Sequence, residues 1–141
     1  MFLTENDYDT LILDEDRLLI SKETLKVRQD AEGMAIDQIS GFIRNKYNVQ
    51  ATFALQGDAR SKVLVMYTMD IALYHLHSSV PGRFVPEIRR IRYEDALSWL
   101  KDIAKGLISP DFPLITDPET GETVTGPAFI YGSSTKQDNS W

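Results

Sequence analysis

The stretch from Arg60 to His77 is the feature that most constrains the fold of this chain. From Val63 to Leu76 it is apolar on nearly every helical turn, and only Thr68, Asp70 and His75 are polar within that range. A helix that is apolar on all sides is buried on all sides, so other helices must surround this one. The run is too short, and too interrupted by Asp70 and His75, to span a bilayer. We therefore expect a small domain built around a central helix, with no membrane contact.

Asp70 lies in the middle of this apolar run and needs a partner, because an unpaired buried charge is strongly destabilising. Arg92, Arg60 and Arg44 are the candidates for a structural ion pair with it. No second acid, nucleophile or phosphate-binding loop lies near Asp70 in the sequence. We therefore assign Asp70 an architectural role, not a catalytic one.

Four arginines, Arg83, Arg89, Arg90 and Arg92, form a basic cluster before and within the last helical stretch. We do not expect Arg89 and Arg92 to face the core together, so at least two of the four should be free. Arg83, Arg89 and Arg90 are then candidates for contact with an acidic partner surface or with DNA phosphate. The alternative is a solvated helix face with one arginine turned inward.

Two further stretches have the period of a long helix. The first spans about Val27 to Tyr47, and we expect its Gly41 to allow close approach to the central helix. The second spans Glu87 to Lys105, after Pro86 at its first position and before a terminating Gly106. Their expected core stripes are Ile36, Ile39, Ile43 and Tyr47 in the first, and Tyr93, Leu97, Leu100 and Ala104 in the second.

Shorter segments complete the helical part of the chain. Thr4 and Asp7 have the spacing of a capping box at the start of a helix that runs to about Thr10, and residues 14–19 could form another brief turn. We expect residues 49–55 to form an extended connector, followed by Asp58 as the N-cap of the central helix. The predicted fold class is all-α: a small bundle of three long helices plus short N-terminal helices.

The character of the sequence changes after Gly106, where four prolines rule out a long helix. Residues 114–116 and 122–125 flank a turn with Gly121 at the left-handed position, which predicts a C-terminal β-hairpin. The rest has the composition of an extended tail. We therefore divide the chain into a helical domain, 1–106, and a C-terminal hairpin and extended arm, 107–141. The aromatic residues expected to contact a partner in this arm are Phe129, Tyr131 and Trp141.

Charge is unevenly distributed along the chain, whose net charge is −6. Residues 1–32 carry 9 acids and 4 bases, residues 33–106 carry 7 and 10, and residues 107–141 carry 5 and 1. Acidic ends favour basic patches on a protein partner over nucleic acid. His75 and His77 are two residues apart on a helix, so they point in different directions and cannot chelate a metal together. We expect no enzyme activity, no cofactor and no metal.

Two motifs carry a resemblance to a known family. They are DIALYHL, from Asp70 to Leu76, and RYEDALSWLKDIAKG, from Arg92 to Gly106. Together with the order of the helices, they resemble the Mu-like prophage head-tail connector family of tailed bacteriophages. The resemblance covers about residues 2–113, so it leaves out most of the C-terminal arm.

The resemblance implies a non-enzymatic helical protein that assembles as a homo-oligomeric ring of twelve copies beneath the portal protein. Such a ring extends the channel for the passing genomic DNA, without sequence-specific contact, and is the platform for the tail or a second neck protein. It implies a protein made in the host cytoplasm and found at the head-tail interface of the virion. The alternative is a monomeric cytoplasmic interaction module that recognises a peptide through Met66, Met69 and Trp99.

Overall fold

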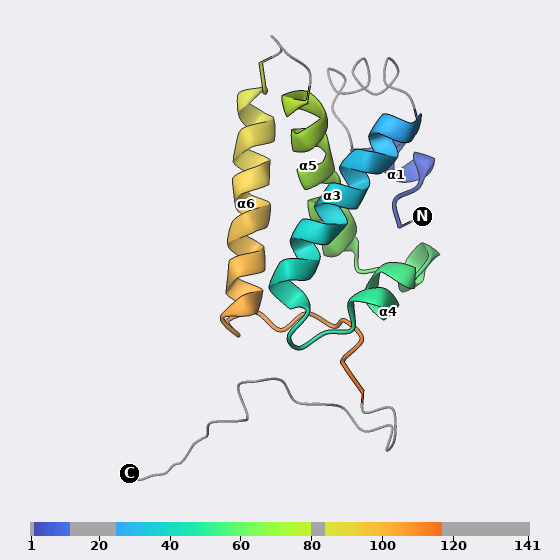
Figure 1. Ribbon diagram of the computed structural model, residues 1–141, viewed down its shortest axis with the longest axis vertical. Coiled ribbons are helices and arrows are strands. Elements are labelled where there is room, and N and C mark those ends of the chain that lie inside the picture. The colour runs from blue at the N-terminus through green and yellow to red at the C-terminus, as the bar shows by residue number, and fades with distance from the viewer. Residues whose placement is uncertain (1, 12–24, 80–83, 117–141) are drawn as a thin grey trace.

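The computed structural model describes residues 2–11, 25–79 and 84–116 (Figure 1). These residues form α1 (Glu5–Leu11), α3 (Leu25–Ile43), α4 (Val49–Ala54), a 3-10 helix (Gly57–Ala59), α5 (Lys62–Ser78) and α6 (Glu87–Ala104). The three long helices α3, α5 and α6 lie side by side, and α5 contacts α1, α3 and α6. The long helices alternate in direction, so α3 and α6 both begin at the end of the bundle where α5 finishes. The predicted all-α bundle of three long helices is confirmed for the described residues.

The central helix is α5, and it forms where the apolar run predicts it. Ser61 caps it, since the Ser61 hydroxyl oxygen accepts a hydrogen bond from the Leu64 amide at 3.3 Å. Asp58, the expected cap, lies one turn earlier in the 3-10 helix. Ten residues of α5 are buried, and they come from every side of that helix: Leu64, Val65, Thr68, Met69, Asp70, Ile71, Ala72, Leu73, Leu76 and His77.

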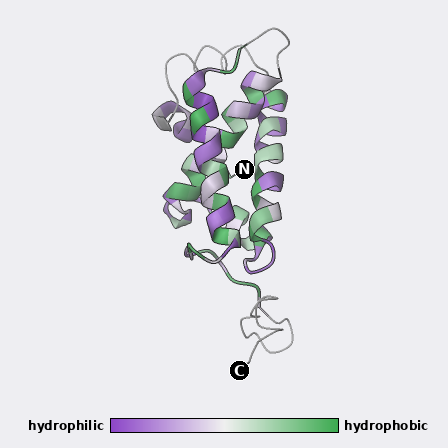
Figure 2. Ribbon diagram, turned by 90° about the vertical axis from the view of Figure 1, so that its left-hand side faces the viewer, coloured by the Kyte–Doolittle hydropathy of each residue, from purple (hydrophilic) through white to green (hydrophobic). Residues whose placement is uncertain are grey.

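The outer long helices each bury one face against α5. Ala35, Ile39 and Ile43 of α3 are buried, and Tyr47 is buried just beyond its end. In α6 the buried residues are Arg89, Ala96, Leu100 and Ile103, whereas Ala104, predicted in the core, is exposed. Figure 2 shows hydrophobic and hydrophilic residues alternating along the ribbons of these helices, as amphipathic packing requires.

Residues 49–54 are helical, and the prediction of an extended connector here is wrong. Asn48 is the N-cap of α4, and its side chain accepts a hydrogen bond from the Ala51 amide at 3.0 Å. The apolar residues at 49, 51 and 53 alternate, but α4 is too short for its period to be distinguished from that of a strand.

The segment after α6 returns across the base of the bundle. Gly106 adopts a φ of +80°, which ends the helix as predicted. Phe112 is buried between Tyr47 and Trp99, with ring centroids 5.4 and 6.2 Å away, so residues assigned from sequence to a separate arm belong to the core. Leu114 forms an isolated antiparallel bridge with Tyr47 instead of a hairpin strand, and the described residues contain no strand. The second predicted hairpin strand, 122–125, lies outside the described residues, as does the turn at 14–19.

Candidate functional site

A buried ion-pair centre joins α5 to α6. Asp70 is 3% exposed, and its Oδ1 accepts hydrogen bonds from Arg92 Nε at 2.9 Å and from Arg89 Nη1 at 3.2 Å. Arg89 is itself 1% exposed. Arg89 and Arg92 are three residues apart on α6 and therefore share one face, which lets both guanidinium groups reach the same carboxylate. The prediction that Arg89 and Arg92 do not face the core together is therefore wrong.

The structure separates the other arginines that the sequence singled out. Arg60 pairs with Asp7, and Arg44 Nε donates to the Ser40 carbonyl at 3.3 Å, so neither contacts Asp70. Arg89, predicted to contact a partner, is buried and unavailable for that role. Arg90 is exposed and forms ion pairs with Glu87 and Glu94 of its own helix. Arg83, Phe129, Tyr131 and Trp141 lie outside the described residues.

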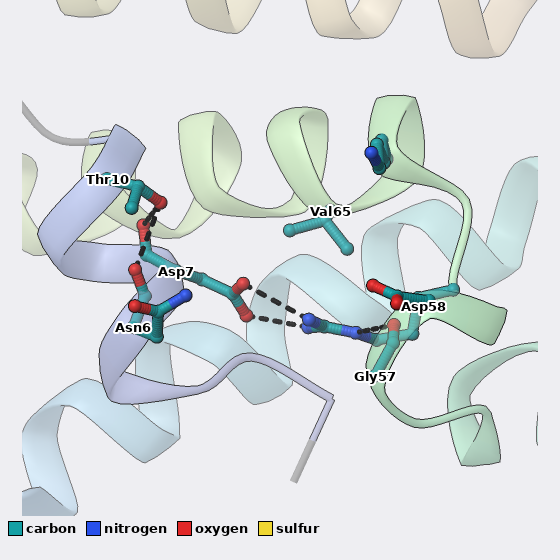
Figure 3. A pocket seen from close by; sticks show the side chains of 8 residues that line it. Asn6, Asp7, Thr10, Gly57, Asp58 and Val65 are labelled. Atoms are coloured by element: carbon teal, nitrogen blue, oxygen red, sulfur yellow. Dashed lines mark hydrogen bonds and ion pairs between the residues drawn. The ribbon is translucent and has the colours of Figure 1, made fainter.

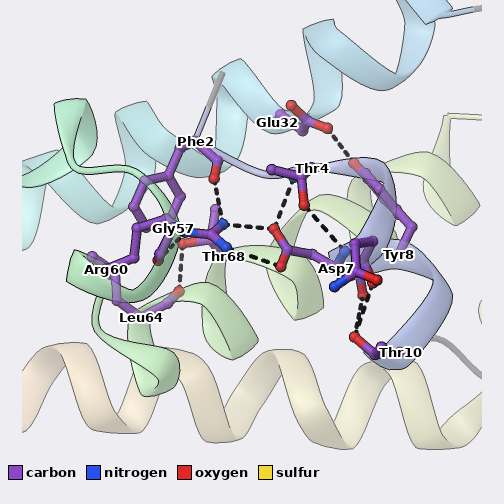
Figure 4. A network of polar contacts seen from close by, with 11 residues as sticks. Phe2, Thr4, Asp7, Tyr8, Thr10, Glu32, Gly57, Arg60, Leu64 and Thr68 are labelled. Carbon is purple, nitrogen blue, oxygen red and sulfur yellow. Dashed lines mark hydrogen bonds and ion pairs between the residues drawn. The ribbon is translucent and has the colours of Figure 1, made fainter.

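A second ion pair fastens the N-terminal segment to the start of α5 (Figure 4). Asp7 accepts two hydrogen bonds from Arg60, at 2.6 and 3.1 Å, and Arg60 also donates to the Phe2 carbonyl at 2.6 Å. The predicted capping box is present, because the Thr4 amide donates to Asp7 Oδ2 and the Asp7 amide donates to Thr4 Oγ1. Burial raises the pKa of Asp7, but the hydrogen bonds from Arg60 and Thr4 outweigh it and leave the pKa below its ordinary value.

A third polar contact joins α1 to α3. The Tyr8 hydroxyl donates a very short hydrogen bond to Glu32 Oε1, and both residues are buried. Burial raises the pKa of Glu32, partly offset by the Tyr8 hydrogen bond and the nearby Arg28 charge. Arg28 pairs with Glu5 at 2.9 Å and lies over the Tyr8 ring. The cluster therefore fixes the short helix α1 on the bundle, where it could not be stable alone.

A chain of side chains crosses all three long helices. His75 Nε2 lies 3.0 Å from Gln38 Oε1, and Gln38 Nε2 donates to the Tyr93 hydroxyl at 2.9 Å. The rings of Tyr74 and Tyr93 stack with centroids 3.9 Å apart. Burial lowers the pKa of His75. In the described part of the chain, no three His, Asp or Glu side chains are placed to hold a metal ion together.

Two surface hollows of about 370 Å³ each flank the bundle. The first is lined mainly by polar residues and lies beside the Asp7–Arg60 pair, with Asn6, Thr10, Asp58 and Val65 around it (Figure 3). The second is mostly apolar and lies between the start of α3 and the end of α5. Its lining includes Val27, Ala31, Met34 and Leu76.

An exposed apolar stripe runs along the start of α6. Phe84 is 91% exposed, Ile88 39% and Ile91 41%. Phe84 lies in the segment just before α6, and Ile88 and Ile91, three residues apart, lie on one side of the helix. Sequence reasoning missed this stripe, although the signal was present: α6 has a second set of apolar residues, out of phase with the set that forms its core face.

The surface required by the alternative peptide-binding module is incomplete. Met69 is 1% exposed and lies in the core. Trp99 is half-buried and packs against Tyr67, with ring centroids 4.9 Å apart. Met69 therefore cannot contact a peptide, and Trp99 is engaged within the bundle.

Comparison with known proteins places the chain in a family. No helix among the described residues is long and apolar enough to cross a membrane. Neither the curated proteins nor the solved structures contain a match to the chain. The family model described as "Bacteriophage Mu, Gp36" matches residues 3–126 of the 141 residues, which is most of the chain. The chain therefore belongs to the Bacteriophage Mu, Gp36 family of phage proteins.

Proposed function

We propose that this protein is a head-tail connector that assembles as a ring beneath the portal of a tailed phage. The ring, of twelve copies, extends the channel for the passing genomic DNA and is the platform to which the tail or a second neck protein attaches. The protein has no enzymatic role in this proposal and needs no cofactor. It resides at the head-tail interface of the virion.

The observation that supports this proposal most is that the buried carboxylates join different parts of the bundle. Three acids are buried among the described residues, namely Asp7, Glu32 and Asp70. Each of them binds a cation or a hydroxyl from another part of the bundle: Arg60, Tyr8, or Arg89 and Arg92. These contacts hold helices at fixed positions, which is what a subunit needs if its two sides are to meet identical neighbours in a ring.

Membership of a phage Mu family supports the same conclusion from the sequence side. The charge distribution also fits a connector, since acidic segments at both ends of the chain repel DNA phosphate and would let DNA pass without adhering.

A nonsense mutation in the gene for this chain, made in the phage or prophage that encodes it, tests the proposal. Filled heads and separate tails should accumulate, and wild-type protein supplied in trans should join them. Mass spectrometry of purified particles should detect the chain, and averaged images should show density missing beneath the portal in the mutant. Complete, infectious particles that lack the chain would refute the connector role.

A further inference from the structure

The exposed stripe on α6 has the character of a protein-protein anchor. Phe84 lies three residues before the start of α6 with 91% of its surface exposed, and Ile88 and Ile91 are exposed in the first turns of the helix. Aromatic side chains that enter a pocket contribute most to association. We call Phe84, Ile88 and Ile91 the apolar stripe.

The mostly apolar hollow between α3 and α5 is a receptor of suitable size on the same chain. Its volume is about 370 Å³, which exceeds that of one aromatic side chain, and Met34 at its edge is 55% exposed. Methionine adapts its shape to an incoming side chain. We call this hollow the α3–α5 hollow; it is lined by Val27, Asp30, Ala31, Met34, His75, Leu76, Ser78 and Ser79.

We infer that the apolar stripe of one copy docks in the α3–α5 hollow of the next copy and so forms the subunit contact of the ring. This inference rests on the proposed function. The stripe lies at the start of α6 and the hollow at the start of α3 and the end of α5, so both are at the same end of the bundle (Figure 1). A contact between two different surfaces at the same height relates neighbours by a rotation with little rise, and such a contact gives a ring when successive rotations add up to a full turn.

Charges beside the two surfaces are complementary when a neighbour's α6 lies parallel to α3. Going down α3, Lys26 is followed by Asp30, and the two are paired at 3.0 Å with their side chains 81% and 57% exposed. Going down α6, Glu87 is followed by Arg90, and these two are also paired. When the two helices lie parallel, Lys26 faces Glu87 and Asp30 faces Arg90, so opposite charges meet at both positions. Exposed pairs of this kind contribute little within one helix, so they can exchange partners readily.

The full-length protein can be tested directly, by measuring its self-association with sedimentation and mass photometry. Phe84→Ser should weaken association by about tenfold or more, as for an aromatic anchor. Leu107→Ser is the matched control, because Leu107 is 73% exposed but lies past the other end of α6. Equal effects of the two substitutions, or no effect of either, would overturn the inference.

Crosslinking tests which surfaces meet. The chain contains no cysteine, so Met34→Cys with Ile91→Cys places one thiol in the hollow and one in the stripe of every copy. A short bismaleimide should give a ladder that ends at a closed oligomer, whereas each single variant should give none. Met34→Cys with Val63→Cys is the control, since Val63 is 45% exposed at the opposite end of the bundle. Absence of a ladder from the Met34→Cys, Ile91→Cys variant overturns the inference. A protein that is monomeric at every concentration gives no ladder and therefore counts as this negative result.

Charge exchange gives a test that a folding defect cannot imitate. Lys26→Glu and Glu87→Lys should each weaken self-association several-fold, because like charges then meet across the contact. An equimolar mixture of the two variants should associate again, because each mutated surface then meets its complement. Failure of the mixture to recover, with helical content intact, counts against the contact.

These results are separable from the test of the connector role. A chain present in particles but without the stripe-to-hollow ladder keeps the proposed function and loses this contact. A ladder from a chain that particles do not need keeps the contact and loses the connector role.

Discussion

Arg92 donates its Nε–H to Asp70 Oδ1 at 2.9 Å, and this bond ties the middle of α6 to the middle of α5. Arg89 donates to the same oxygen from one turn earlier. Two cations thus hold one carboxylate at the interface between these helices. The angle between α5 and α6 also sets where the apolar stripe lies relative to the α3–α5 hollow, so the subunit contact that we propose depends on this centre.

Replacing Asp70 by Asn should destabilise the fold by about 3–5 kcal/mol, because the buried Arg89 and its neighbour Arg92 lose the negative charge that both of them bind. Urea unfolding followed by circular dichroism measures this directly. Arg90→Gln is the matched control, since it removes an arginine of the same helix whose pairs are exposed. Its stability should match that of the wild type within error. A native-like Asp70→Asn protein would show that the centre is not structural.

Asp7→Asn should cost about 1–3 kcal/mol at neutral pH, as for lost hydrogen bonds to a charged group. The pKa of Asp7 is lower in the folded state than its ordinary value of 3.8. The unfolded chain therefore binds its proton first as the pH falls, and the stabilisation is present above pH 3.8 and is lost below it. Unfolding free energies of the two proteins should converge in acid, and a constant difference down to low pH would contradict the pKa assignment.

Glu32→Gln should show the opposite pH dependence. The pKa of Glu32 is raised above its ordinary value of 4.5, so the folded state binds the proton more tightly than the unfolded state. The wild type therefore loses stability as the pH rises from 4.5 through the folded pKa, whereas the Gln variant does not titrate and still accepts the Tyr8 hydrogen bond. The stability of the variant relative to wild type should rise with pH over that range. Denaturation curves at several pH values test the sign, and a relative stability that falls with pH would refute it.

Much of this architecture could be predicted from the sequence, and the errors have physical causes. The central helix needed only its all-round apolar pattern. The inner face of α6 was predicted in part: Leu100 is buried, and Tyr93 and Leu97 pack against the core. Arg89 was left out of this face because apolar residues alone were counted, whereas its charge is balanced by Asp70 from another helix. This charge pairing depends on the tertiary structure, so a local sequence pattern cannot predict it.

The candidate surface was missed for the converse reason. Phe84 and Ile91 are large apolar residues of the kind usually found in a core, and only the folded bundle shows that they are exposed. The two motifs that carry the family resemblance cover the ion-pair residues Asp70 and Arg92, but they do not indicate which face of α6 is free.

Gly41→Ala should stabilise the protein by about 1 kcal/mol, as alanine does in a helix interior. The expectation that Gly41 allows close approach to the central helix is wrong, since a Cβ at this exposed position would meet nothing within 4 Å. Gly57→Ala is the contrasting variant: the space around it is equally open, but its φ of +57° strains an alanine, and stability should fall. Thermal melts of the two variants should move in opposite directions. A loss of stability in Gly41→Ala would indicate a contact that the bundle alone does not contain.

Truncation tests where the folded unit ends. A chain that stops at residue 116 keeps the buried Phe112 and the hydrogen bond from the Ile115 amide to the Lys46 carbonyl, so it is the reference for a shorter chain. A chain that stops at residue 106 should keep its helices but lose about 3–5 kcal/mol, the cost expected for removing a buried phenylalanine such as Phe112. Phe112→Ala in the full chain should reproduce most of that loss, which separates the effect of one side chain from that of the shortened backbone. If residues 1–106 proved as stable as residues 1–116, the segment after α6 would be an arm lying on the bundle and not a part of its core.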